Sequence, residues 1–88
     1  MDKVAVRPFA VRAVELHNHH GVSWSDMARR GGFKPRKDGY QDVMRFKRLL
    51  GLSPQLKNSK PYFTTHVSYE NAIKLCRALD VLPIDMGL

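Results

Sequence analysis

Four neighbouring side chains between residues 40 and 45 have the chemistry needed to recognise the edges of nucleic-acid bases. The amide of Gln41 can form two hydrogen bonds with an adenine, and the guanidinium of Arg45 can form two with a guanine. Tyr40 and Met44 offer apolar surface that can contact the methyl group of a thymine. These residue types are therefore able to read base identity.

Side chains that can bind backbone phosphates surround this group in the sequence, and such contacts position a protein without specifying a base sequence. They are Arg29, Lys34, Arg36, Lys37, Arg48, Lys57, Lys60, Thr64, Thr65 and His66. The whole chain has a net charge of +7, of which residues 36–66 carry +5, whereas residues 67–88 carry −1. Positive charge favours a polyanionic partner, so the middle third is the expected contact region and the last third the expected scaffold.

The sequence lacks the arrangements typical of enzymes and metal centres. Paired carboxylates, a glycine-rich phosphate loop and a Ser-His-Asp set are all missing. His17, His19 and His20 could attract zinc, but adjacent helical positions diverge, and histidines at a helix C-terminus are favoured by the helix dipole. Cys76 lies in an apolar stripe and is expected to be a buried small hydrophobe. We predict no enzyme activity, no metal and no cofactor.

Length and composition predict one domain over residues 1–88. The single cysteine, Cys76, cannot form an internal disulfide, which indicates a reducing compartment, most simply the cytoplasm. The apolar runs are too short for a membrane span or a signal peptide, so we expect no membrane partner.

Apolar spacing and capping signals predict the helices. The first helix is expected to start at Pro8, to place Phe9, Ala13 and Leu16 on one face, and to stop at Gly21. Ser23 is expected to cap a second, short helix, and Asp38 a third helix over residues 38–50. The expected core residues of this pair are Trp24, Val43, Phe46 and Leu50. A short helix followed by a polar, basic one predicts a helix-turn-helix over about residues 23–51.

The remaining third of the chain is less regular. Residues 55–67 combine a turn signal with residues that favour extended backbone, so a short hairpin or extended wing is an option there. Ser68 is expected to cap a fourth helix, and Pro83 to start a last short turn. The expected fold class is therefore all-α, a compact bundle of about five short helices to which a wing at 55–67 could be added.

The order of these motifs resembles that of the lambda-repressor-like domains of the Cro and cI type. The run MARRGGF at 27–33 looks like their second helix and turn, VMRFKRLLG at 43–51 like their third helix, and residues 67–88 like their fourth and fifth helices. The resemblance implies that the family's base-reading positions fall at the start of the third helix, on Tyr40, Gln41, Met44 and Arg45. The connections at 31–37 and 51–68 are longer than is usual in that family. The resemblance is to small repressors of temperate phages of actinobacteria, which implies action on the nucleoid of a bacterial host cell.

We therefore expect a sequence-specific transcriptional regulator, of the repressor kind, that places helix 38–50 in the major groove of double-stranded operator DNA. The apolar segment 81–88 is the candidate surface for a homodimer. A monomer extended by its wing and a DNA-binding fragment of a longer regulator are alternatives to the dimer. The other function classes are an interaction module, such as an antitoxin or anti-repressor, and an RNA-binding protein that stacks bases on Tyr62 and Phe63.

Overall fold

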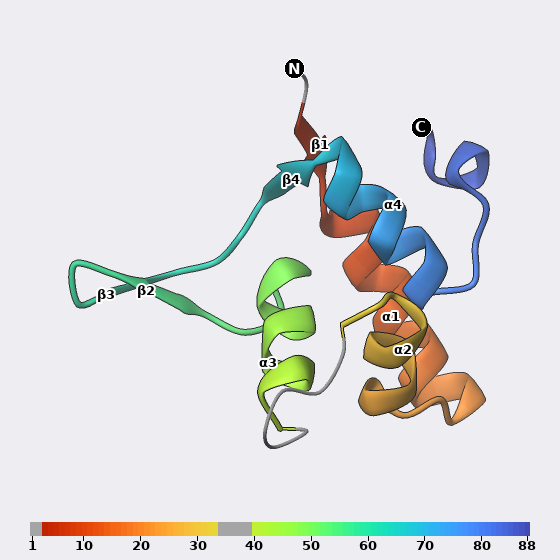
Figure 1. The fold of residues 1–88 in the computed structure, drawn as a ribbon, viewed down its shortest axis with the longest axis horizontal. Helices are drawn as coiled ribbons and strands as arrows, with labels where there is room; N and C mark the ends of the chain where they lie inside the picture. Colours follow the sequence, from red (N-terminus) through yellow and green to blue (C-terminus); the bar gives the residue numbers. More distant parts are fainter. Residues whose placement is uncertain (1–2, 34–39) are drawn as a thin grey trace.

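The chain forms short strands as well as helices, so the predicted all-α fold class is wrong. The computed structural model describes residues 3–33 and 40–88, with the side chains of residues 40–42 excepted. The elements are β1 (Lys3–Ala5), α1 (Arg7–His20), α2 (Trp24–Arg30), α3 (Tyr40–Leu49), β2 (Gln55–Lys57), β3 (Lys60–Tyr62), β4 (His66–Ser68), α4 (Tyr69–Ala78) and the 3₁₀ turn η1 (Pro83–Met86) (Figure 1). The strands form two separate two-stranded antiparallel sheets, β1–β4 and β2–β3, so the class is mixed α/β.

The helix boundaries follow the local signals in the sequence. Ser23 caps α2 by accepting a hydrogen bond from the backbone N–H of Asp26 at 3.1 Å, and Ser68 caps α4 through the N–H of Asn71 at 3.2 Å. Gly21 ends α1 with φ at 66°, the left-handed conformation that glycine adopts without strain. None of the helices within the described ranges has the length and apolar character of a membrane-spanning segment.

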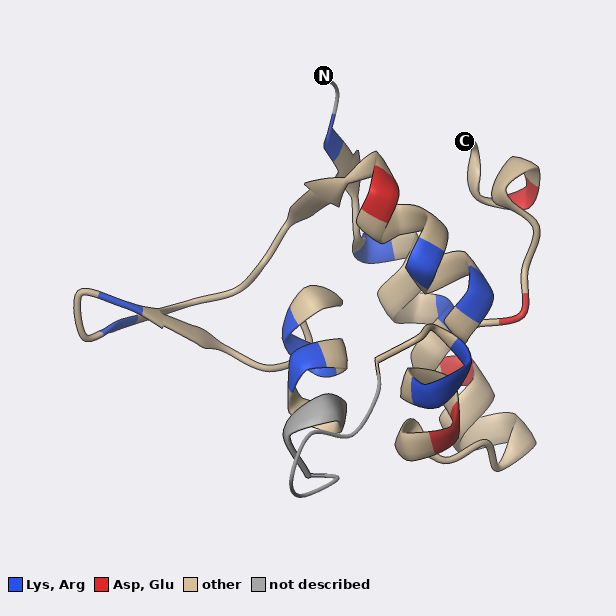
Figure 2. Cartoon of the chain, viewed as in Figure 1, with Lys and Arg blue, Asp and Glu red and all other residues tan. Residues whose placement is uncertain are grey.

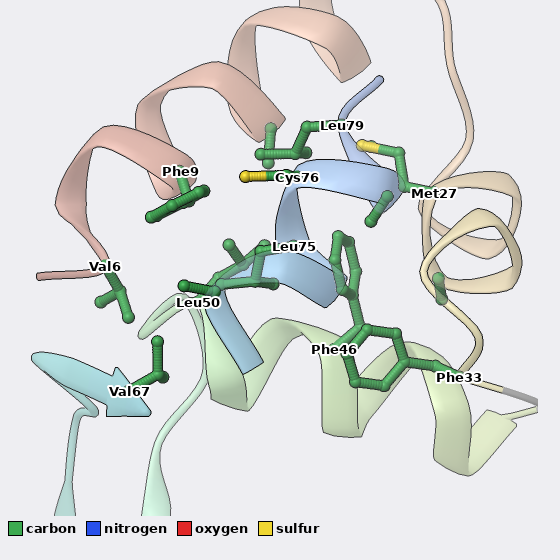
Figure 3. Packing of buried hydrophobic residues seen from close by; sticks show 14 of the residues in the cluster. Val6, Phe9, Met27, Phe33, Phe46, Leu50, Val67, Leu75, Cys76 and Leu79 are labelled. Carbon is green, nitrogen blue, oxygen red and sulfur yellow. The ribbon is translucent and has the colours of Figure 1, made fainter. Parts of the chain in front are cut away.

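The core lies where α4 meets the three other helices (Figure 3). Leu75 and Cys76 of α4, with Leu79 just after its end, face Phe9 of α1 and Phe46 of α3. Each large apolar side chain buried in this way contributes about 1.5–3 kcal/mol relative to exposure. The prediction of a buried Cys76 is confirmed, and burial raises the pKa of its thiol above the usual value.

The expected core of the helix pair is confirmed for Phe46 and Leu50, which are fully buried. Trp24 and Val43 are half-buried, so they lie at the edge of the core instead. Trp24 packs between His17 and Phe46, with ring centroids at 4.8 Å and 6.4 Å respectively.

The strand β1 was not predicted, and it ties the N-terminus to the entrance of α4. Lys3, Val4 and Ala5 pair with Ser68, Val67 and His66 in antiparallel register. The backbone N–H of Val6 extends the pairing by donating to the carbonyl of Thr65 at 3.0 Å. Val6 and Val67 are both buried in the core. Their burial and the strand pairing fix the position to which the segment after the hairpin returns.

The second sheet is a hairpin that projects from the body of the molecule (Figure 1). Its two-residue turn, Asn58 and Ser59, has positive φ at both positions, 52° and 63°, as a type I′ turn requires. At its base, the side-chain amide of Gln55 donates to the hydroxyl of Thr64 at 2.7 Å. We call residues 55–62 the wing.

Gly51 allows the end of α3 and the segment returning from the wing to approach closely. Its φ is 76°, and a Cβ at this position would lie 2.4 Å from the carbonyl oxygen of Thr64. Gly21 has a similar φ of 66°, but a Cβ there would meet no atom within 4 Å. Comparing alanine substitutions at the two positions therefore separates the energetic cost of a left-handed backbone conformation, which both share, from that of a steric clash, which arises at Gly51 alone.

We predict that Gly51→Ala lowers the free energy of unfolding by about 1–3 kcal/mol more than Gly21→Ala does, because both substitutions strain the backbone while Gly51→Ala alone also overpacks it. Denaturant unfolding followed by the fluorescence of Trp24 measures both losses. Equal losses would contradict the close approach of Gly51 to Thr64.

Candidate nucleic-acid interface

The third helix has one face in the core and one face in solvent. Phe46 and Leu50 point inward, whereas Arg45 and Arg48 are exposed and Met44 is half-buried on the other side. Residues three or four positions apart share a helical face, so Met44, Arg45 and Arg48 form one row. Arg48 also lies in the last turn of α3, where a positive charge complements the helix dipole.

The other residues predicted to contact DNA from this region are only partly described. Tyr40 and Gln41 belong to the first turn of α3, but their side chains lie outside the described part of the structure. Lys34, Arg36 and Lys37 fall in the segment 34–39, which also lies outside it.

An aromatic cluster holds α3 against α2. The ring of Phe46 lies 5.5 Å from that of Phe33 and 6.4 Å from that of Trp24, between ring centroids. Lys47 covers the outer side of this cluster, with its Nζ 4.8 Å from the centroid of Trp24, a cation–π distance. Nine residues separate the end of α2 from the start of α3, more than the three or four of a usual helix-turn-helix turn.

Two basic residues face each other at the tip of the wing. Lys57 of β2 pairs directly with Lys60 of β3, and both are exposed. Like charges directly opposite one another destabilise an antiparallel pair, and an isolated two-stranded hairpin is marginally stable in water. An anion bound at the tip would offset the repulsion between the two lysines.

Thr64, Thr65 and His66 lie elsewhere than Lys57 and Lys60, although all five were predicted as phosphate contacts of one wing. The hydroxyl of Thr64 accepts the bond from Gln55, and that of Thr65 lies 3.1 Å from Nδ1 of His66. All three residues line an apolar groove of about 710 Å³ against α1. The structure therefore brings the two lysines together and separates the other three from them.

A polar cleft adjoins the row on α3. It has a volume of about 260 Å³ and is lined by residues of α3, β2 and α4, among them Arg45, Arg48, Gln55 and Lys74. Lys74 belongs to the part of the sequence predicted to be scaffold, because that part has a negative net charge. A helical pattern alone cannot show that α4 turns this residue toward α3, since that depends on how the two helices pack.

In the described part of the chain, carboxylates pair with one cation of α1 and one of α2, and with none around the cleft and the wing. Within the described ranges, the ion pairs are Arg12–Glu15, at 2.7 Å, and Arg29–Asp26, at 3.7 Å. Arg29, predicted to bind phosphate, is thus already in a loose, exposed pair of the kind worth about 0–1 kcal/mol. No described carboxylate forms an ion pair with Arg45, Lys47, Arg48, Lys57, Lys60 or Lys74. Figure 2 shows in blue the Lys and Arg residues of α3, the wing and α4.

The histidines of α1 have structural surroundings. Nδ1 of His17 lies 3.0 Å from the carbonyl oxygen of Val22, and its ring stacks on Trp24. Among the residues that the structure describes, no group of three or more potential metal ligands comes together.

Comparison with known proteins found no match: no family model, no curated protein and no solved structure matches the chain. The geometry and charge of the molecule are therefore the basis for assigning a function.

Proposed function

We propose that this protein binds double-stranded DNA in a sequence-specific manner and regulates transcription, as a repressor does by occupying an operator. The observation that carries the proposal is the set of cations on the outer face of α3 and at the tip of the wing, without carboxylate partners among the described residues. Maintaining such a surface costs electrostatic energy in the free protein, and a polyanion offsets this cost.

The shape of the surface favours duplex DNA over other polyanions. The major groove is about 12 Å wide and admits a single α-helix. A helix buttressed by α2 and α4, with Met44, Arg45 and Arg48 exposed or half-exposed in one row, can enter that groove. The wing begins six residues after the end of α3, so Lys57 and Lys60 can reach a phosphate flanking the same groove.

RNA binding is the second candidate, and it has its own observation. Tyr62 and Phe63 are 43% and 56% exposed, and exposed aromatic rings can stack on unpaired bases. Affinity for single strands above that for duplexes would favour this function over the first.

Selection from a pool of random duplexes tests the proposal. A sequence-specific protein enriches one site, and its affinity for that site falls steeply as salt increases. Two-fold symmetry in the selected site would support a homodimer, for which the exposed Leu82 and Ile84 of the C-terminal segment are candidate contacts. Flat enrichment after repeated rounds would refute sequence-specific binding.

We predict that Arg45→Ala weakens binding to the selected site by about 1–3 kcal/mol and relaxes the preference at one base pair, because a bidentate contact to guanine is lost. Binding constants for the site and for each of its single-base variants measure both effects. Uniform weakening over all variants would instead assign Arg45 to a phosphate.

For the wing, we predict that Lys60→Ala reduces the slope of log affinity against log salt by about one, because one phosphate contact disappears. Lys3→Ala is the matched control, since Lys3 is also an exposed lysine on a strand but belongs to the other sheet. If both variants leave the slope unchanged, the wing does not contact the DNA backbone.

A further inference from the structure

The polar cleft between α3, β2 and α4 is a pocket with positively charged walls. Arg45 and Arg48 line it from α3, Lys74 and Asn71 line it from α4, and Gln55 lines it from β2. None of the described residues that line it is acidic. Its volume of about 260 Å³ lies below the range of about 300–1,000 Å³ typical of pockets for drug-sized ligands, so it suits a small anion.

Gln55 and Lys74, two of the polar residues that line the cleft, make further contacts with their neighbours. The amide of Gln55 donates to Thr64 at 2.7 Å, and its carbonyl oxygen accepts from the hydroxyl of Tyr62 at 3.3 Å. The Nζ of Lys74 lies 6.0 Å from the ring centroid of Phe33. Because a carboxamide nitrogen has two N–H groups, the bond to Thr64 leaves Gln55 one donor for a ligand.

Asn71 of α4 adds a second side-chain donor to the lining of the cleft. It is the third residue of α4, next to the helix N-terminus, where the helix dipole favours negative charge. Its backbone N–H is already bound to the hydroxyl of Ser68, so the side chain is the group that Asn71 can offer to the cleft.

We infer that this cleft binds a single phosphate group, held chiefly by Arg48 and Lys74 and completed by Gln55 and Asn71. Three cations in one small cleft repel one another, and a phosphate offsets that repulsion. The planar fork of an arginine fits two phosphate oxygens, while a lysine supplies a point charge. The phosphate can belong to a DNA backbone, in which case the inference rests on the proposed function, or to a free phosphate-bearing molecule.

Titration with inorganic phosphate, replacing chloride at constant ionic strength, tests the cleft without DNA. The side-chain amide signals of Gln55 and Asn71 in nitrogen–proton NMR spectra are expected to shift and saturate. Lys74→Gln is expected to weaken this binding by about tenfold or more, the effect of losing a charged hydrogen bond. Arg77→Gln is the control, because Arg77 is an exposed cation on the same helix that does not line the cleft.

Duplex binding by the same two variants identifies the source of the phosphate. A selective loss of duplex affinity in Lys74→Gln, relative to Arg77→Gln, assigns the cleft to a backbone phosphate. Equal duplex affinities together with a saturable phosphate shift assign it to a free ligand. If the unaltered protein binds no duplex, the proposed function fails and the phosphate titration still decides on the cleft.

Two results would overturn the inference. One is a phosphate shift that survives Lys74→Gln, which would place the anion elsewhere. The other is the absence of any amide shift combined with no selective loss of duplex affinity in Lys74→Gln.

Discussion

The burial of Phe46 determines which way α3 presents its charged residues. The ring is fully buried and lies against Phe33 and Trp24, between the helix that carries it and α2. Because residues one or two positions away on a helix point in other directions, an inward Phe46 leaves Arg45 and Arg48 on the outer side. Apolar packing thus sets the orientation of the basic row, while the like charges within the row oppose one another.

The wing shows the same opposition between charge and stability. Its strands have three residues each, and β3 is exposed along its whole length. The left-handed turn residues Asn58 and Ser59 set its register, and that register brings Lys57 and Lys60 together. Uncharged contacts therefore position both the basic row on α3 and the lysine pair of the wing, despite the repulsion between like charges. Such an arrangement is expected of a surface that binds a polyanion.

How much the sequence could predict depends on the range of the interaction involved. Ser23, Ser68 and Gly21 mark helix ends through contacts within a few residues, and all three were predicted correctly. Strand β1 was missed because it has three residues and a partner more than sixty positions away, which no local pattern reveals.

The candidate site divides in the same way. The outward position of Arg45 and Arg48 follows from helical periodicity, so the sequence was sufficient for it. The separation of Thr64, Thr65 and His66 from Lys57 and Lys60 depends on the return of the chain to pair with β1. Lys74 was overlooked because its charge was summed with that of nearby acids in sequence, although in space it lines the same cleft as Arg48.

The position of Lys74 has an energetic consequence that links binding to folding. The cleft takes its cations from α3 and α4, two helices held together by the packing of Phe46, Leu50 and Leu75. An unfolded chain does not assemble these cations, so an anion that binds across the cleft stabilises the native state by mass action. A small domain gains much from such a contribution, because its own core is modest and its net stability is a small difference between large terms. Repulsion among these cations lowers the stability of the free fold, and its relief by a bound anion therefore adds to the stability of the anion-bound fold.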